Sequence, residues 1–413
     1  MSIERRRFLA VAAAATGASL LPLGRHGWAV AAAQPVNRRL VVVMLRGAVD
    51  GLNVVAPWGD PNYQAMRPTI GLARPGADGG LLDLDGHFGL HPALAPLLPL
   101  WQQGRLAFVH ACGSPDPTRS HFDAQDFMES GTPGIRTTPD GWMNRLVAAL
   151  PGPHGPTQAI SVGATRPRIL AGRQANSNLP LGPNAGKPLP VDRPGVAEAF
   201  DRLYAGNDPL STAYRDGRMA RQELTGNLPT EQEIADNGAP SPTGFPAVAG
   251  RLAGLLLRDD RIALAFADLG GWDTHVNQGA ATGQLANHLQ PLGEGVAALA
   301  RGLGSRLDDT VLLVMSEFGR TAHENGNQGT DHGHGNLVWV LGGQVAGGRL
   351  HGAWPGLAPD NLYQGRDLAV GTDFRTVIAT VLERHLGLAD RQIAAVLPPP
   401  PAFASALPGL FRG

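Results

Sequence analysis

Short, continuous apolar stretches recur along the chain and predict buried strands. The first, Arg39–Leu45, is apolar from its second residue onward and rich in valine. Such runs are typical of strands that are covered on both faces in a parallel sheet. Further runs of this kind lie at residues 106–110, 159–162, 262–266, 310–315 and 337–341.

Helical patterns alternate with these runs. The clearest lie at residues 92–103, 122–130, 284–303 and 374–386. Because strand and helix alternate, we predict an α/β fold, a three-layer αβα sandwich with a mostly parallel central sheet. The pattern changes at residues 173–250, which are rich in Pro, Gly and Asn and have helix candidates at 196–203 and 214–224. We interpret this stretch as an insertion, and a candidate cap of the site, in a domain that spans residues 34–413.

The first residues have the pattern of a secretory signal peptide. Arg5-Arg6-Arg7 is followed by an apolar run over residues 8–23 and by small residues at 29–33. A charged start, an apolar middle and an A-x-A end predict a signal peptide over residues 1–33. The arginine pair before x-Phe-Leu resembles the twin-arginine type, so we expect the twin-arginine export machinery as a partner and a periplasmic or extracellular location. The apolar run is shorter than the roughly 20 residues of a membrane span, so no stable span is expected.

Composition narrows the class of protein. The 413 residues include 34 basic and 35 acidic ones. This near-balance argues against a nucleic-acid partner, which requires a clustered basic surface. The single cysteine excludes a disulfide scaffold and any multi-cysteine metal site. The 55 glycines and 35 prolines indicate many loops around a compact core.

Polar residues gather where the predicted strands end. Clusters occur at residues 46–51, 110–123, 268–275 and 316–321, and a fifth at 329–335 precedes the last strand. In open α/β sheets, ligands bind beyond the carboxyl ends of the strands. A single aspartate or histidine there is often only a helix cap or a buried hydrogen-bonding group. Five clusters at one predicted edge favour a functional site.

These clusters contain carboxylates and imidazoles without thiolates, a combination that suits divalent metal ions. We expect one or two ions of zinc, manganese, iron or calcium. Two such ions could clamp the attacking and leaving oxygens of an ester displacement. The candidate ligands are Asp50, Asp273, His275, Glu317, Asp331, His332 and His334.

Candidate catalytic groups lie close to the predicted start of a helix. Ser120 could be a nucleophile at a helix N-terminus, where the backbone dipole favours an oxyanion, or a plain helix cap. Thr118 and Ser114 are weaker candidates. Arg119 and Arg320 could bind anionic oxygens in a bidentate way, or form structural salt bridges. His121 is a candidate for proton transfer or for orienting a ligand.

Together, the motifs resemble a known family. Six segments carry the resemblance: Leu45-Arg46-Gly-Ala-Val-Asp50-Gly-Leu-Asn, Phe88-Gly-Leu-His91-Pro, Arg119-Ser120-His121-Phe-Asp123, Trp272-Asp273-Thr-His275, Ser316-Glu317-Phe-Gly-Arg320-Thr and Asp331-His332-Gly-His334-Gly. They resemble motifs of the secreted domain of unknown function 1501 (DUF1501) family. That family is similar to a branch of the alkaline phosphatase and sulfatase superfamily.

The resemblance implies roles for several residues. Asp50 would bind metal, Ser120 would be the nucleophile, and Asp273 and His275 would form an Asp…His ligand pair. Where the superfamily usually has Asp-His after a central strand, this chain has Glu317-Phe318, which removes one imidazole. The segment Cys112-Gly-Ser-Pro does not fit the formylglycine sulfatase signature.

Two hypotheses follow. The first is an exported metal-dependent hydrolase of phosphate or sulfate esters, with a small-molecule or glycan ester as its substrate. The alternative is a secreted, non-catalytic binding or assembly module for a cell-wall glycan or a partner protein. The Glu317-Phe318 departure and the large polar insertion motivate the alternative. A phosphomutase-like enzyme is a third interpretation, disfavoured by export.

Overall fold

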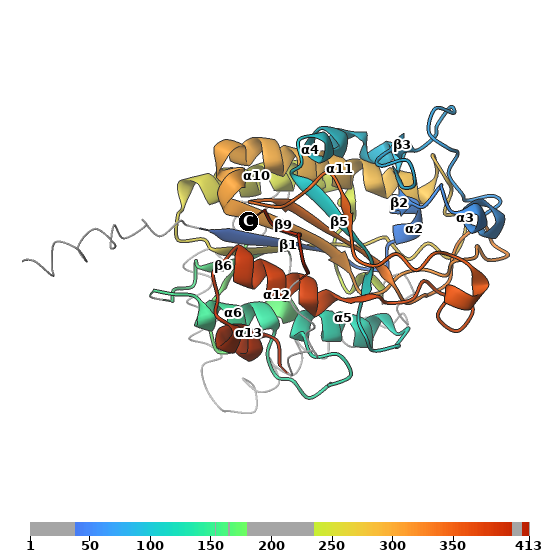
Figure 1. The fold of residues 1–413 in the computed structure, drawn as a ribbon. Coiled ribbons are helices and arrows are strands. Elements are labelled where there is room, and N and C mark those ends of the chain that lie inside the picture. Colours follow the sequence, from blue (N-terminus) through green and yellow to red (C-terminus); the bar gives the residue numbers. More distant parts are fainter. Residues whose placement is uncertain (1–37, 153, 164–165, 180–234, 399–406, 413) are drawn as a thin grey trace, which may run out of the picture. The chain divides into compact units, whose positions relative to one another are not determined.

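A computed structural model describes residues 38–152, 154–163, 166–179, 235–398 and 407–412 (Figure 1). The signal peptide predicted for residues 1–33 lies outside these ranges, as do the helix candidates at 196–203 and 214–224. Among the described residues, no helix combines the length and hydropathy that a membrane crossing needs.

A nine-stranded sheet forms the centre of the unit that follows residue 37. Its strands run in the order β11 (Leu350–His351), β5 (Leu106–Gly113), β10 (Asn336–Gly342), β9 (Thr310–Ser316), β1 (Arg39–Leu45), β8 (Leu264–Leu269), β6 (Ala159–Val162) and β7 (Ser177–Leu179), and β12 (Thr372–Asp373) also pairs with β5. Strand β10 is antiparallel to both neighbours, whereas the other pairings are parallel. The predicted mostly parallel α/β sheet is therefore confirmed.

The direction of β10 has a local cause. Parallel neighbours need a crossover of a dozen or more residues, usually a helix. Residues 317–335, which join β9 to β10, contain no helix. The chain therefore turns back, and β10 begins at the edge where β1, β8 and β9 end.

Strand β1 separates two cores, because its alternate side chains point to opposite faces of the sheet. Leu40, Val42 and Met44 belong to one cluster and Val41, Val43 and Leu45 to the other, all almost fully buried. The first core is covered by α6 (Trp142–Ala149), α12 (Phe374–Arg384) and α13 (Asp390–Val396), and the second by α10 (Phe245–Arg258) and α11 (Gln284–Leu303). Figure 1 shows these two helix layers on opposite sides of the sheet.

Most predicted helices are present, with some differences. The stretch 92–103 is divided into a 3-10 helix, η1 (Pro92–Leu97), and α4 (Leu98–Gln102), because Pro96 lacks a backbone N–H and interrupts the α-helical bonding. Residues 245–250, at the end of the predicted insertion, begin α10, which packs on α11.

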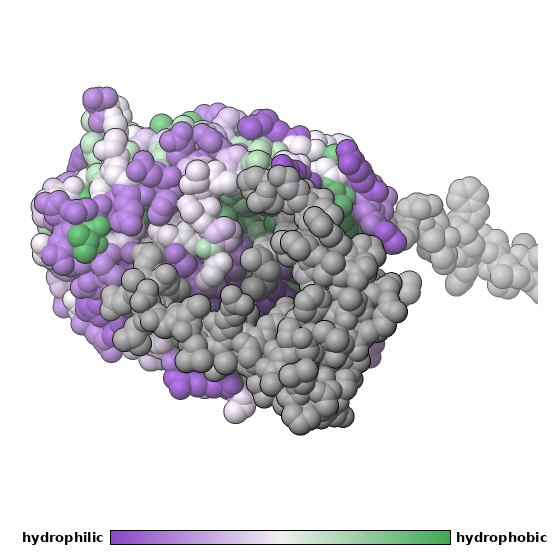
Figure 2. Space-filling model, turned by 180° about the vertical axis from the view of Figure 1, so that it is seen from behind, coloured by the Kyte–Doolittle hydropathy of each residue, from purple (hydrophilic) through white to green (hydrophobic). Residues whose placement is uncertain are grey.

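Smaller elements complete the described chain. They are α2 (Gly51–Val54), β2 (Val55–Ala56), α3 (Pro61–Met66), β3 (Leu82–Asp83), β4 (Gly89–Leu90), α5 (His121–Ser130), η2 (Arg168–Leu170), η4 (Pro242–Gly244), η5 (Gly304–Asp309) and η6 (Pro359–Asn361). On the face drawn in Figure 2, the described surface is mostly hydrophilic, with hydrophobic residues in small separate groups.

The turn from β9 back to β10 depends on a close backbone approach at Gly319. Its N–H donates to the carbonyl of His334 at 2.9 Å, and its carbonyl accepts from the N–H of Gly333 at 2.8 Å. A Cβ atom at this position would lie 1.9 Å from the carbonyl oxygen of Gly335. Only glycine lets these two segments come so close.

We expect Gly319→Ala to lower the free energy of unfolding by about 2 kcal/mol or more, because backbone atoms must move to admit the methyl group. Gly326→Ala is the matched control, since a Cβ there meets nothing within 4 Å. Urea titration followed by circular dichroism measures both variants. Equal midpoints for the two would contradict the close-approach argument.

Candidate functional site

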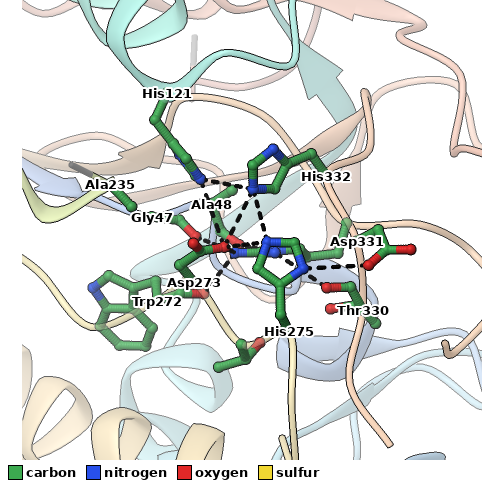
Figure 3. A network of polar contacts seen from close by, with 12 residues as sticks. Gly47, Ala48, His121, Ala235, Trp272, Asp273, His275, Thr330, Asp331 and His332 are labelled. Carbon is green, nitrogen blue, oxygen red and sulfur yellow. Dashed lines mark hydrogen bonds and ion pairs between the residues drawn. The ribbon is translucent and has the colours of Figure 1, made fainter. Parts of the chain in front are cut away.

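Four polar side chains from distant parts of the sequence converge at the carboxyl edge of the sheet (Figure 3). Asp273 and His275 follow β8, His121 is the first residue of α5, and His332 precedes β10. Helix α5 begins here because the Ser120 side chain accepts a hydrogen bond from the Asp123 N–H at 3.4 Å. Sheet topology and one helix cap thus bring the three imidazoles to one carboxylate.

The donor atoms of this cluster are almost equally spaced. His332 Nε2 lies 2.9 Å from Nε2 of His121 and 2.9 Å from Nε2 of His275. Asp273 Oδ1 lies 3.6, 3.0 and 3.3 Å from Nε2 of His121, His275 and His332, respectively. A tetrahedral zinc ion with bonds of 2.0–2.1 Å keeps its ligands about 3.3 Å apart. His121, Asp273 and His332 therefore have spacings that suit a bound metal ion.

Each imidazole is oriented by an oxygen behind it. His121 Nδ1 contacts Glu317 Oε1 at 2.8 Å, His332 Nδ1 contacts the Arg119 carbonyl at 2.9 Å, and His275 Nδ1 contacts Asp331 Oδ1 at 3.2 Å. These oxygens can only accept, so each Nδ1 carries the proton. Metal-binding histidines are typically oriented in this way.

This tautomer has a direct consequence at the centre of the cluster. With the proton on Nδ1, each neutral imidazole presents a lone pair at Nε2. His332 Nε2 then faces two other lone pairs at 2.9 Å. Such contacts are repulsive unless extra protons or a cation lie among them. The cluster must therefore bind either protons or a metal ion.

The carboxylates of Asp273 and Glu317 raise the pKa values of the neighbouring histidines. Burial alone would lower the pKa of His121, but hydrogen bonds and charge from Asp273 and Glu317 raise it to about 9. The hydrogen bond to Asp273 also raises the pKa of His275. Burial opposes ionisation of Glu317, yet His121 holds its pKa at about 2. The pKa of Asp273 lies well below its ordinary value, because hydrogen bonds from the three histidines outweigh burial.

Arg320 holds Asp273 in place and is itself fully buried. Its guanidinium donates to Asp273 Oδ1 and to four backbone carbonyls. These carbonyls belong to Gly47 at 2.5 Å, Ala48 at 2.7 Å, Trp272 at 3.2 Å and Thr330 at 3.2 Å. Because these donors bond groups inside the protein, the role of Arg320 is structural: it holds the Asp273 carboxylate in position.

One side of the cluster is open to solvent. The side chains of His275 and His332 are 29% and 26% exposed, and that of Asp331 is 51% exposed. His121 and Asp273 are buried. The cluster is therefore accessible from the side of His275, His332 and Asp331.

The candidate ligand Asp50 lies in a different network. Its carboxylate receives Arg67 Nη1 at 2.5 Å, Arg67 Nη2 at 3.0 Å and Gln278 Nε2 at 2.7 Å. Asp50 and Arg67 are both fully buried. Both carboxylate oxygens thus have hydrogen-bond partners outside the histidine cluster.

The other candidates take several positions. Glu317 and Asp331 lie behind histidines, as described above, rather than at the centre. His334 is buried, with its ring centroid 4.5 Å from that of Tyr363. Ser120 caps α5 and is exposed, and Arg119 pairs with Asp367 at 2.6 Å.

Sequence reasoning did not single out Arg67, Gln278 or Asp367. They lie outside the apolar runs and the polar clusters that follow them. Each acts through a contact that only the fold creates, so no local pattern could have identified it.

Comparison with known proteins places the chain in a family. A family model described as "Protein of unknown function (DUF1501)" matches residues 37–397, and the chain belongs to this family. A comparison with curated proteins finds no match.

Solved structures similar to the chain include members of the alkaline phosphatase and sulfatase superfamily. The lipoteichoic acid synthase LtaP from Listeria monocytogenes matches with a TM-score of 0.37 and 8% identity, over 86% of this chain and 73% of that one. An alkaline phosphatase superfamily protein from Vibrio parahaemolyticus has a TM-score of 0.37 and 11% identity, over 76% and 62%. The 2-O GAG sulfatase BT1596 has a TM-score of 0.38 and 10% identity, over 85% and 71%.

We expect Arg320→Lys to lower the free energy of unfolding by about 2 kcal/mol or more, because a lysine cannot reproduce the planar set of donors. Zinc affinity should fall about tenfold or more, since Asp273 loses its orienting partner. Isothermal titration calorimetry and urea unfolding measure the two effects.

Arg39→Lys is the matched control for Arg320→Lys. Arg39 is also buried, and it donates to the Ile262 carbonyl and to Asp260 at the other end of β1. This variant should lose stability but keep its zinc affinity. A similar loss of zinc affinity in both variants would show that Arg320 acts only through global stability.

We expect the metal-free protein to lose stability as pH rises from about 6.5 to about 9. The folded state raises the pKa of His121 to about 9, above its unfolded value of about 6.5, so the stabilisation is complete below the lower value and lost through the higher one. The loss should be on the order of 1–3 kcal/mol. Thermal melts in chelator measure it. His121→Gln should flatten the profile, whereas His154→Gln, at an exposed histidine, should not.

Proposed function

We propose that this chain is a metal-dependent hydrolase of phosphate or sulfate esters that is exported from the cytoplasm. One divalent ion would be held by His121, Asp273 and His332, with His275 beside them. The observation that carries the proposal is the convergence of three imidazole Nε2 atoms on one carboxylate oxygen. Export rests on the signal peptide predicted for residues 1–33.

The donor set limits the identity of the ion. Three imidazole nitrogens and one carboxylate oxygen suit zinc, iron or manganese. Calcium prefers six to eight oxygen ligands and is disfavoured here. We expect one ion per chain, because Asp50, the candidate best placed to begin a second site, is neutralised by Arg67.

A bound divalent ion would supply a Lewis acid that polarises an ester oxygen or activates water. The residues of this chain would position the reactants. Glu317 and the Arg119 carbonyl fix the rings of His121 and His332. Substrate would enter on the open side, where His275 and His332 are partly exposed.

Ser120 is the candidate nucleophile of the chain itself. Its hydroxyl is on an exposed residue directly before His121, and it caps α5. Attack by this hydroxyl on phosphorus or sulfur would release the alcohol and form a seryl ester, which water would then hydrolyse. Direct attack by water would need no seryl ester.

The test begins with chelated protein that is reloaded with zinc, manganese or ferrous iron. Plasma mass spectrometry should give about one ion per chain, and aryl phosphates or sulfates should turn over with at least one ion. Asp273→Asn and His332→Ala should lose both metal and turnover. His154→Ala, at an exposed position, should lose neither.

Two outcomes would contradict the proposal. One bound ion without turnover of any ester would favour the alternative of a binding module with a structural metal. No bound ion would contradict the metal site itself.

Ser120→Asn separates the two routes of hydrolysis, because asparagine is also a good helix cap but has no hydroxyl. Complete loss of turnover with normal metal content would support the seryl ester. Retained turnover would assign the attack to water.

A further inference from the structure

Two arginines flank His332 on the open side of the cluster. Arg119 Nη2 donates to Asp367 Oδ2 at 2.6 Å, and Arg366 Nε lies 3.7 Å from Asp367 Oδ1. Asp367 is fully buried, whereas the arginine side chains are 31% and 39% exposed. Two guanidinium groups thus share one carboxylate.

Arg366 contacts the backbone of His332, and Arg119 contacts its side chain. Arg366 Nη2 donates to the His332 carbonyl at 2.8 Å, and the Arg119 carbonyl accepts from His332 Nδ1 at 2.9 Å. The turn that carries Arg366 is also fixed, because its carbonyl accepts from the Ala322 N–H at 3.0 Å. The Arg366 guanidinium is therefore held beside a proposed metal ligand by a direct contact, and the Arg119 guanidinium is held by Asp367.

The pair retains donors that the protein does not use. Among the described residues, Arg119 Nε is buried without a hydrogen-bond partner. Nη1 of Arg119 and Nη1 of Arg366 also have no hydrogen bond to any described residue. A buried donor without a partner is costly, so such an atom in a folded protein calls for an explanation, such as a missing ligand.

The charges around the cluster are arranged asymmetrically. Asp331 lies on the His275 side of the opening and contacts His275 Nδ1 at 3.2 Å. The shared arginines lie on the His332 side. An anionic group that reaches the cluster would be repelled on the first side and attracted on the second.

The geometry points to Arg119 and Arg366 as a clamp for the anionic oxygens of the substrate, with Asp367 as the residue that positions both. This inference rests on the proposed hydrolase function and narrows its substrate class. The guanidinium of Arg366 presents planar donors that match two oxygens of one phosphate or sulfate group. Arg119 would add its Nη1, because its Nη2 already donates to Asp367 and to Gln364 Oε1 at 2.8 Å. The substrate would be a monoester with several free oxygens, rather than a neutral ester.

A simple surface salt bridge is the competing explanation. Such pairs contribute little to stability and need only one cation for each carboxylate. Here a second cation lies near Asp367, and both Arg119 Nε and Asp367 Oδ1 are buried without a hydrogen-bond partner in the described part of the chain. The clamp accounts for the second cation and the free donor, whereas the salt bridge accounts for neither.

The test measures equilibrium binding of tungstate, a tetrahedral oxyanion, to the zinc-loaded chain by calorimetry. Arg119→Gln and Arg366→Gln should each weaken tungstate binding about tenfold or more, with zinc content unchanged. Arg366→Lys should recover only part of the loss, because lysine keeps the charge without the planar donors. Arg306→Gln is the matched control, since Arg306 is also paired and 36% exposed but precedes β9 at the other edge.

The outcomes separate the clamp from the hydrolase. If both glutamine variants bind tungstate as tightly as the unaltered chain, or if that chain binds none, the clamp is wrong, whether or not esters are hydrolysed. If tungstate binding falls in these variants but no ester turns over, the clamp is supported and the hydrolase is contradicted. If esters do turn over, the same variants should raise KM more than they lower kcat.

Discussion

The buried contact between Arg320 and Asp273 is the interaction on which the site depends. Arg320 reaches carbonyls in the loop after β1, in the loop after β8 and in the segment before β10. A buried ion pair is tolerated only when its remaining donors and acceptors are also satisfied. One guanidinium meets that condition and at the same time joins three loops that approach from different parts of the sequence.

The close contacts among the three imidazoles are the least favourable part of this arrangement. Three imidazole Nε2 atoms face one another, and they are compatible only when protons or a cation lie among them. Their orientation is imposed from behind by Glu317, the Arg119 carbonyl and Asp331. The two apolar cores on either side of the sheet stabilise the scaffold that holds these rings. Such preorganisation suits the proposed metal site, because the ligands would not have to rearrange when an ion bound.

The sequence predicted the scaffold better than it predicted the roles of individual residues. Continuous apolar runs identified the strands, because burial on both faces leaves a strong local pattern. The same edge rule predicted a shared location for His121, Asp273, His275 and His332, and in the structure these four side chains lie together. It could not show that Asp50 is bonded to Arg67, or that Arg320 is directed inward, because side-chain partners are set by tertiary contacts. The sequence also did not predict that β10 is antiparallel. That direction depends on a turn in which the backbone at Gly319 lies against the backbone at Gly335.

Helix α5 holds the His121 side of the site more rigidly than the loops hold the side of His275 and His332. One turn after His121, Gln125 donates to Glu317 Oε1 at 3.0 Å and accepts from Arg46 Nη1 at 2.8 Å. The same helix face thus fixes the carboxylate that orients His121 and links it to Arg46, directly after β1. His275 and His332 come from loops and are partly exposed. Any adjustment to a ligand should therefore occur on their side, where the chain also places Asp331 and the arginine pair, while His121 and Asp273 keep their positions.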